Sequence, residues 1–65
     1  MKRIDLVRHL KIHGCVLARE GANHSVFFNM LEKRTSTVPR HQEISAFLAK
    51  KICKDLAVPP LEHKR

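Results

Sequence analysis

The stretch CVLAREGANHSVFFN, residues 15–29, decides how this chain folds. Residues 15–20 and residues 24–29 read as short strands, the second of them rich in β-formers. The connection between them consists of Gly21, Ala22 and Asn23. Glycine and asparagine tolerate a positive φ, so this connection predicts a hairpin turn. His24 begins the second strand, at a position that does not require an ionisable side chain. It can be a turn residue, a binding residue or a catalytic residue.

A third strand is predicted downstream of this hairpin. Residues 30–33 make a second short connection, and residues 34–38, RTSTV, are β-branched and polar. Three short strands joined by short turns are typical of an antiparallel meander. Phe27 and Phe28 are adjacent, so only one of them can face a core. The pattern therefore leaves open which face of the sheet His24 shares.

A helix is predicted on each side of the strands. Residues 3–13 carry apolar residues at helical spacing with Leu6 beside them, namely Ile4, Val7 and Leu10, and Gly14 suits a left-handed helix end. Residues 43–57 restore the helical period, with Glu43 in the first turn, where the helix dipole favours an acid. Their apolar stripe consists of Ile44, Phe47, Leu48, Ile52 and Leu56.

Both helices must bury an apolar stripe, and one face of the sheet is the obvious surface for it. We therefore expect an α+β fold, a single small domain of order α-β-β-β-α, with a three-stranded antiparallel sheet and two helices on one face. The chain has 65 residues, and a chain this short buries only about 60% of its unfolded surface. Residues 1–59 are expected to form the domain and residues 60–65 a charged, mobile tail.

The net charge of +7 indicates an anionic partner, which can be a nucleic acid, an acidic protein or a membrane surface. The membrane is the weakest of these, since no segment approaches about 20 apolar residues. The N-terminal MKRIDLVRHLKIHG carries charge throughout and so lacks the apolar core of a signal peptide. We expect a cytoplasmic protein that does not associate with a membrane.

No metal or cofactor site is expected. His9 and His13 stand four residues apart, a spacing that can hold a metal, but no glutamate or third histidine accompanies them. Cys15 and Cys53 fit no metal spacing. In a reducing cytosol they are expected to be small buried hydrophobes, with a disulfide or a reactive thiol as the alternatives.

If the partner is RNA, it can be cleaved without a metal when the 2′-hydroxyl attacks the adjacent phosphate. This reaction needs a base that titrates near neutral pH, a proton donor and positive charge for the transition state. His24 can serve as base or acid, and the neighbouring Arg19 supplies charge. The chain has no Trp or Tyr, so base stacking is not expected to be the main mode of recognition.

Two further cationic segments can hold phosphates. The segment TVPRH places Arg40 and His41 just before the second helix, whose free N–H groups attract anions. The segment KKICK projects lysines from the helix face opposite the apolar stripe, namely Lys50, Lys51 and Lys54. An ordinary loop and a solvated helix face are the alternatives. His41 is also a candidate for the second proton-transfer group, since no other is evident.

Taken together, LVRHLKIHGCVLAREGANHSVFFN and RTSTVPRHQEISAFLAKKICKDL resemble the HicA-type mRNA interferase toxins over residues 1–59. The resemblance implies a fold like that of double-stranded-RNA-binding domains. It implies ribosome-independent cleavage of mRNA by the toxin of a bacterial type II toxin–antitoxin pair, and attack by the 2′-hydroxyl makes this cleavage metal-independent. It also implies that His24 is catalytic, that Gly21 is the turn glycine, and that a HicB-type antitoxin neutralises the toxin.

On this reading the expected RNA contacts are Arg19, Asn23, Arg40, His41, Lys50, Lys51 and Lys54, and the antitoxin should be acidic where it covers His24. The chain departs from the family at Ala22, where a second glycine is common, and at residues 29–33, where Asn-Pro-x-x-Gly is common. Two other functions stay open, namely a non-catalytic RNA-binding module and a basic scaffold for an acidic protein.

Overall fold

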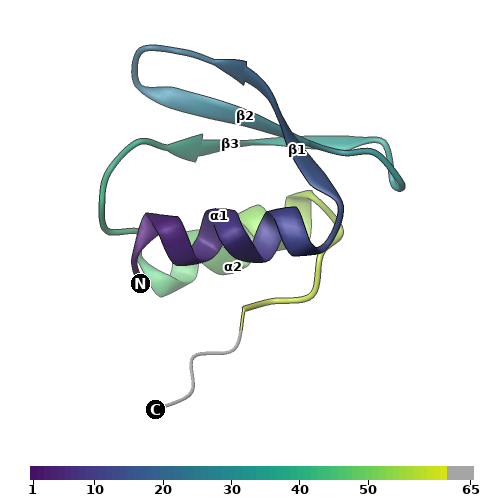
Figure 1. Ribbon diagram of the computed structural model, residues 1–65. Helices are drawn as coiled ribbons and strands as arrows, with labels where there is room; N and C mark the ends of the chain where they lie inside the picture. The colour runs from purple at the N-terminus through teal and green to yellow at the C-terminus, as the bar shows by residue number, and fades with distance from the viewer. Residues whose placement is uncertain (62–65) are drawn as a thin grey trace.

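The structure is a computed structural model, and it describes residues 1–61 (Figure 1). The elements in chain order are α1 (Arg3–Ile12), β1 (Cys15–Glu20), β2 (His24–Asn29), β3 (Arg34–Pro39) and α2 (Ala46–Asp55). The strands pair antiparallel in the order β1-β2-β3, and both helices lie on one side of the sheet (Figure 1). The predicted α+β fold is therefore confirmed. The predicted tail lies, beyond its first two residues, outside the part that the structure describes.

The alternation of side chains along β2 settles which face His24 shares. The buried residues of this strand are Ser25, Phe27 and Asn29, which point toward the helices. Phe27 is therefore the core aromatic of the pair, whereas Phe28 is only half-buried. Because successive side chains of a strand point to opposite faces, His24 lies with Phe28 on the face that no helix covers. We call this face the open face of the sheet.

Helix α1 buries only part of the predicted stripe of Ile4, Val7 and Leu10. Leu6 and Leu10 are fully buried, whereas Ile4 is 60% exposed. The prediction that Ile4 belongs to the buried stripe is wrong, because the helix rests on the sheet along the Leu6–Leu10 row. Gly14 has a φ of +87° and ends the helix in the left-handed conformation, as predicted.

Helix α2 begins at Ala46, three residues later than the sequence indicates. The Ser45 side chain caps it by accepting a hydrogen bond from the Leu48 N–H at 3.1 Å. The residues before Ser45 are extended because they pair with the start of the chain. Glu43 bridges Lys2 in an antiparallel arrangement. The prediction that Glu43 lies in the first helical turn is therefore wrong.

The face that α2 buries also differs from the predicted stripe. Ile52 and Leu56 are buried as predicted, but Phe47 is 80% exposed and points to solvent. Ala49 and Cys53 pack toward the sheet in its place. The small core is thus filled mainly by aliphatic side chains of both helices and by Phe27 and Val38 of the sheet. No helix within residues 1–61 is long and apolar enough to cross a membrane.

The two cysteines are buried free thiols, which confirms the expectation that they act as small hydrophobes. Burial raises the pKa of the Cys15 thiol, and the Cys53 thiol raises it further by electrostatic repulsion. Burial also raises the pKa of Cys53, against a smaller opposing effect of a backbone hydrogen bond from Leu61. Both thiols are therefore protonated at neutral pH and have low reactivity as nucleophiles.

Candidate functional site

His24 stands at the mouth of the β1–β2 hairpin, exposed to solvent on the open face. The turn before it is closed by a hydrogen bond of 2.7 Å from the Gly21 N–H to the His24 carbonyl oxygen. A Cβ atom on Gly21 would lie 3.1 Å from this oxygen, which is tighter than most real Cβ contacts. Glycine is thus needed here for close approach. The positive φ that the sequence suggested is absent from both Gly21 and Asn23.

A β-bulge in β1 decides which side chains accompany His24. Leu17 pairs with Phe27, but Arg19 pairs with Val26, so Ala18 has no partner of its own. If the two strands paired in regular register, Ala18 would face Val26, and Arg19 would face Ser25 and point toward the helices. The bulge instead turns Arg19 onto the open face, diagonally across from His24 and within reach of it.

The side chains around His24 line a hollow of about 540 Å³ on the open face. Its lining comes from the ends of all three strands and from the turn, and consists of Arg19, Gly21, Ala22, Asn23, His24, Val26 and Thr37. The sequence-predicted residues Arg19 and Asn23 are therefore brought together with His24. The lining combines one cation, one amide and one imidazole with small and apolar groups. Such a hollow can receive an anionic ligand and offer it a proton acceptor or donor.

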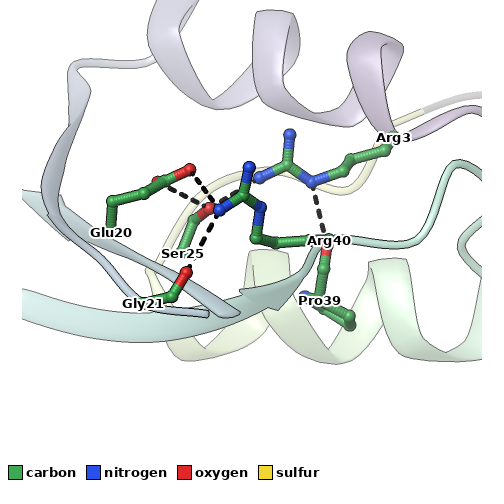
Figure 2. A network of polar contacts seen from close by, with 6 residues as sticks. All are labelled: Arg3, Glu20, Gly21, Ser25, Pro39 and Arg40. Carbon is green, nitrogen blue, oxygen red and sulfur yellow. Dashed lines mark hydrogen bonds and ion pairs between the residues drawn. The ribbon is translucent and has the colours of Figure 1, made fainter. Parts of the chain in front are cut away.

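A network of polar contacts supports the turn from the side of the helices (Figure 2). Ser25 is 1% exposed. Its hydroxyl accepts a hydrogen bond from Arg3 Nη2 at 2.7 Å and donates one to Glu20 Oε1 at 2.9 Å. On the other side of the carboxylate, Arg40 Nη1 lies 3.2 Å from Glu20 Oε2 and donates to the Gly21 carbonyl at 3.1 Å. Figure 2 shows the Glu20 carboxylate in contact with both Ser25 and Arg40.

The remaining predicted contacts are distributed over two parts of the molecule. Arg40 and His41 follow β3 directly, at the same end as the β1–β2 turn (Figure 1). The helix lysines are exposed on α2, in the layer on the other side of the sheet from the open face, namely Lys50, Lys51 and Lys54. Lys51 Nζ also lies 3.2 Å from Asp55 Oδ2. The fold therefore does not bring these lysines together with His24.

Sequence reasoning missed the residues beneath the turn. Arg3 is one of several charged residues in a helical pattern, and nothing in that pattern distinguishes it from its neighbours. Its Nε donates to the Pro39 carbonyl at 2.9 Å, across 36 positions of the chain. Glu20 and Ser25 are visible as neighbours of His24, but the bulge that pairs them is not. Only the tertiary structure reveals the three residues as one network.

His9 and His13, at the C-terminal end of α1, contact each other and the segment that follows α2. The rings of His9 and His13 meet edge to face, with centroids 4.6 Å apart. The His9 Nε2 donates to the Pro59 carbonyl at 2.7 Å, which fastens α1 to the segment after α2. Within residues 1–61 no group of three or more potential ligands, counting histidine, cysteine, aspartate and glutamate, is arranged to hold a metal ion.

The chain matches the protein-family model described as HicA toxin of bacterial toxin–antitoxin over residues 4–58. The matched range contains all three strands, α2 and every site residue that the sequence predicted. No curated protein and no solved structure gave a significant match to the chain.

Proposed function

Because the chain belongs to the HicA toxin family and is thus a toxin of a toxin–antitoxin system, we propose that it is a metal-independent, ribosome-independent endoribonuclease that cleaves mRNA through His24. One observation carries the proposal. The His24 imidazole is exposed on the only sheet face that the described residues leave uncovered, in a hollow that also holds Arg19 and Asn23. An RNA strand can reach that ring without any rearrangement of the core.

In the proposed reaction His24 takes the proton of a ribose 2′-hydroxyl and so acts as the general base. The 2′-oxygen then bonds to the adjacent phosphorus, and the bond from phosphorus to the 5′-oxygen breaks. The products are a 2′,3′-cyclic phosphate and a free 5′-hydroxyl. The leaving oxygen takes a proton from His41 or from solvent. Arg19 balances the charge that develops on the phosphate oxygens.

The grip on the RNA divides into two parts in this proposal. Asn23, Arg40 and His41 hold the strand near the cut, because they lie at the same end of the molecule as His24. The lysines of α2 contact phosphates remote from the cut, since they project from the helical layer. All of these contacts release counterions, so affinity for RNA should fall steeply as salt rises.

The neutralising partner in this proposal is a HicB-type antitoxin that covers His24. Its contact surface is acidic, because it must match a chain of net charge +7. The mRNA and the antitoxin both meet the toxin in the cytoplasm. Covering the open face blocks access of RNA to the hollow and leaves the fold of the toxin unchanged.

The test compares wild type with His24→Ala, both in cells under controlled expression and as purified proteins on a defined RNA. Wild type should arrest growth and shorten the RNA in excess chelator, and His24→Ala should do neither while keeping its fold. The matched control is His13→Ala, which removes the same ring from the far end of α1 and should cleave like wild type.

Two outcomes would contradict the proposal. An RNA-cleaving His24→Ala protein would remove the catalytic assignment, and strict dependence on Mg²⁺ would remove the mechanism. Salt-sensitive binding of intact RNA by wild type, with no shortening, would instead identify a non-catalytic RNA-binding module. If the protein showed no measurable RNA affinity at physiological salt, the remaining function would be that of a basic scaffold that binds an acidic protein.

A further inference from the structure

We propose that Glu20 is a positioning residue for His24. Its carboxylate is held between Ser25 and Arg40, and through them it fixes the β1–β2 turn and the direction of the imidazole that follows it. The catalytic part of this inference rests on the proposed function. The structural part, that Glu20 holds the turn rigid, does not depend on any activity.

The bulge in β1 creates the first link. By inserting Ala18 it turns Glu20 away from the open face and pairs it with Ser25, the residue next to His24. The buried Ser25 hydroxyl uses both of its roles, since it donates to Glu20 Oε1 at 2.9 Å and accepts from Arg3 at 2.7 Å. A buried hydroxyl with both bonds made has one orientation, so β2 is fixed immediately beside His24.

The second oxygen of Glu20 fixes the turn itself. Arg40 Nη1 lies 3.2 Å from Glu20 Oε2 and donates to the Gly21 carbonyl at 3.1 Å. The Arg40 backbone N–H also donates to the Asn23 carbonyl at 3.3 Å. Arg40 therefore holds both ends of the three-residue turn, and the Glu20 carboxylate holds Arg40.

The charges explain why a carboxylate is needed at this position. Arg3 and Arg40 approach the same place from α1 and from the end of β3, and the Glu20 carboxylate accepts from Ser25, which Arg3 also contacts, and pairs with Arg40 (Figure 2). Without it the Ser25 hydroxyl loses its acceptor and the Arg40 guanidinium loses its ion-pair partner. The Glu20 and Arg40 side chains are 44% and 46% exposed, so their ion pair contributes little to overall stability. The loss should therefore appear as a looser turn in a protein that still folds.

The kinetic test uses Glu20→Ala in the full chain, with Glu32→Ala as the matched control. Both changes remove one exposed carboxylate next to a hairpin connection and alter the net charge equally. Glu20→Ala should lower kcat on a defined RNA by about 10- to 100-fold and change KM much less, because the displaced His24 costs rate while the other proposed RNA contacts remain. Glu32→Ala should keep both constants. Glu20→Gln keeps one acceptor oxygen and should restore part of kcat.

A second measurement needs no RNA. Hydrogen exchange of the Gly21 amide, which donates to the His24 carbonyl at 2.7 Å, should be at least about tenfold faster in Glu20→Ala than in Glu32→Ala if the turn is loosened. If Glu20→Ala does not fold, Ser25→Ala breaks the same link without changing the charge and should give the same two effects.

Equal Gly21 exchange and equal kcat in Glu20→Ala and Glu32→Ala would overturn the inference. A raised KM with unchanged kcat would also overturn it, because that split marks a residue that acts on binding alone. If wild type fails to cleave RNA, the proposed function fails, and the exchange measurement still decides whether Glu20 holds the turn.

Discussion

Asn29 Nδ2 donates a hydrogen bond of 2.7 Å to the carbonyl oxygen of Leu56, which joins the end of β2 to the end of α2. The Oδ1 atom of the same side chain accepts from the backbone N–H groups of Leu31 and Glu32, at 3.0 and 3.2 Å. Asn29 is only 2% exposed. One amide therefore shapes the β2–β3 connection and also fastens it to the helix layer, which explains how a connection without the usual turn residues is held.

We expect Asn29→Ala to lower the free energy of unfolding by about 2–3 kcal/mol, because it leaves buried backbone groups without partners. Urea denaturation followed by circular dichroism measures the change. Asn23→Ala is the control, since that exposed amide makes no side-chain hydrogen bond among the described residues, and it should shift stability by less than about 0.5 kcal/mol. Equal effects of the two substitutions would mean that the Asn29 contacts add nothing.

Ile52→Ala and Phe47→Ala should differ clearly in their free energy of unfolding, although the sequence places both residues on one apolar stripe. Ile52 is 1% exposed and Phe47 is 80% exposed. Truncating the buried residue should cost about 2–4 kcal/mol, and truncating the exposed one less than about 0.5 kcal/mol. Denaturant midpoints of the two variants provide the measurement. A large loss in Phe47→Ala would show that α2 packs on a face other than the one described.

Ala57→Gly should stabilise the protein. Ala57 follows α2 with a φ of +57°, a left-handed conformation that costs a residue with a Cβ atom about 1 kcal/mol relative to glycine. The expected gain is about 0.5–1 kcal/mol, read as a higher thermal midpoint. Ala22→Gly is the comparison, because Ala22 has no positive φ and glycine there only increases the freedom of the unfolded chain. An equal or lower midpoint in Ala57→Gly would contradict the expectation.

Stability should decline at alkaline pH through the two cysteines. Burial raises the pKa of both thiols above the ordinary value of 9.0, so the unfolded chain loses these protons first as the pH rises. The contribution is therefore complete below pH 9.0 and is lost as the pH passes through the raised values of the folded state. Urea midpoints between neutral and alkaline pH measure it. The double variant Cys15→Ala/Cys53→Ala, which lacks both thiols, should show a shallower decline.

The strands and the position of the turn between β1 and β2 could be predicted closely from local chemistry. The predicted ranges 15–20 and 24–29 agree with β1 and β2, because the hairpin depends on a three-residue turn and on β-forming residues beside it. The helix faces were less predictable. Periodicity indicates that a helix has an apolar side, but Ile4 and Phe47 lie near the edge of that side. Which edge is buried depends on how the helix docks on the sheet.

The candidate site, too, could be predicted only in part from the sequence. His24, Gly21 and Asn23 are adjacent in the sequence, so their grouping is visible there. Arg19 is near them in the sequence as well, but its place on the open face depends on the bulge at Ala18. A strand without the bulge would carry the same residues and point Arg19 toward the helices. No pattern of residue types in β1 announces this shift, because it arises from how β1 pairs with β2.

The sequence by itself thus determined the order of the elements, the hairpin that presents His24 and the membership of the family, since each depends on residues that are close together in the chain. The tertiary structure alone decided the face on which His24 lies and the network of Arg3, Glu20, Ser25 and Arg40 beneath it. The physical reason is sequence separation. The Arg3 guanidinium reaches Ser25 and Pro39 across 22 and 36 positions, and such contacts form only when packing of the core brings α1 against the sheet.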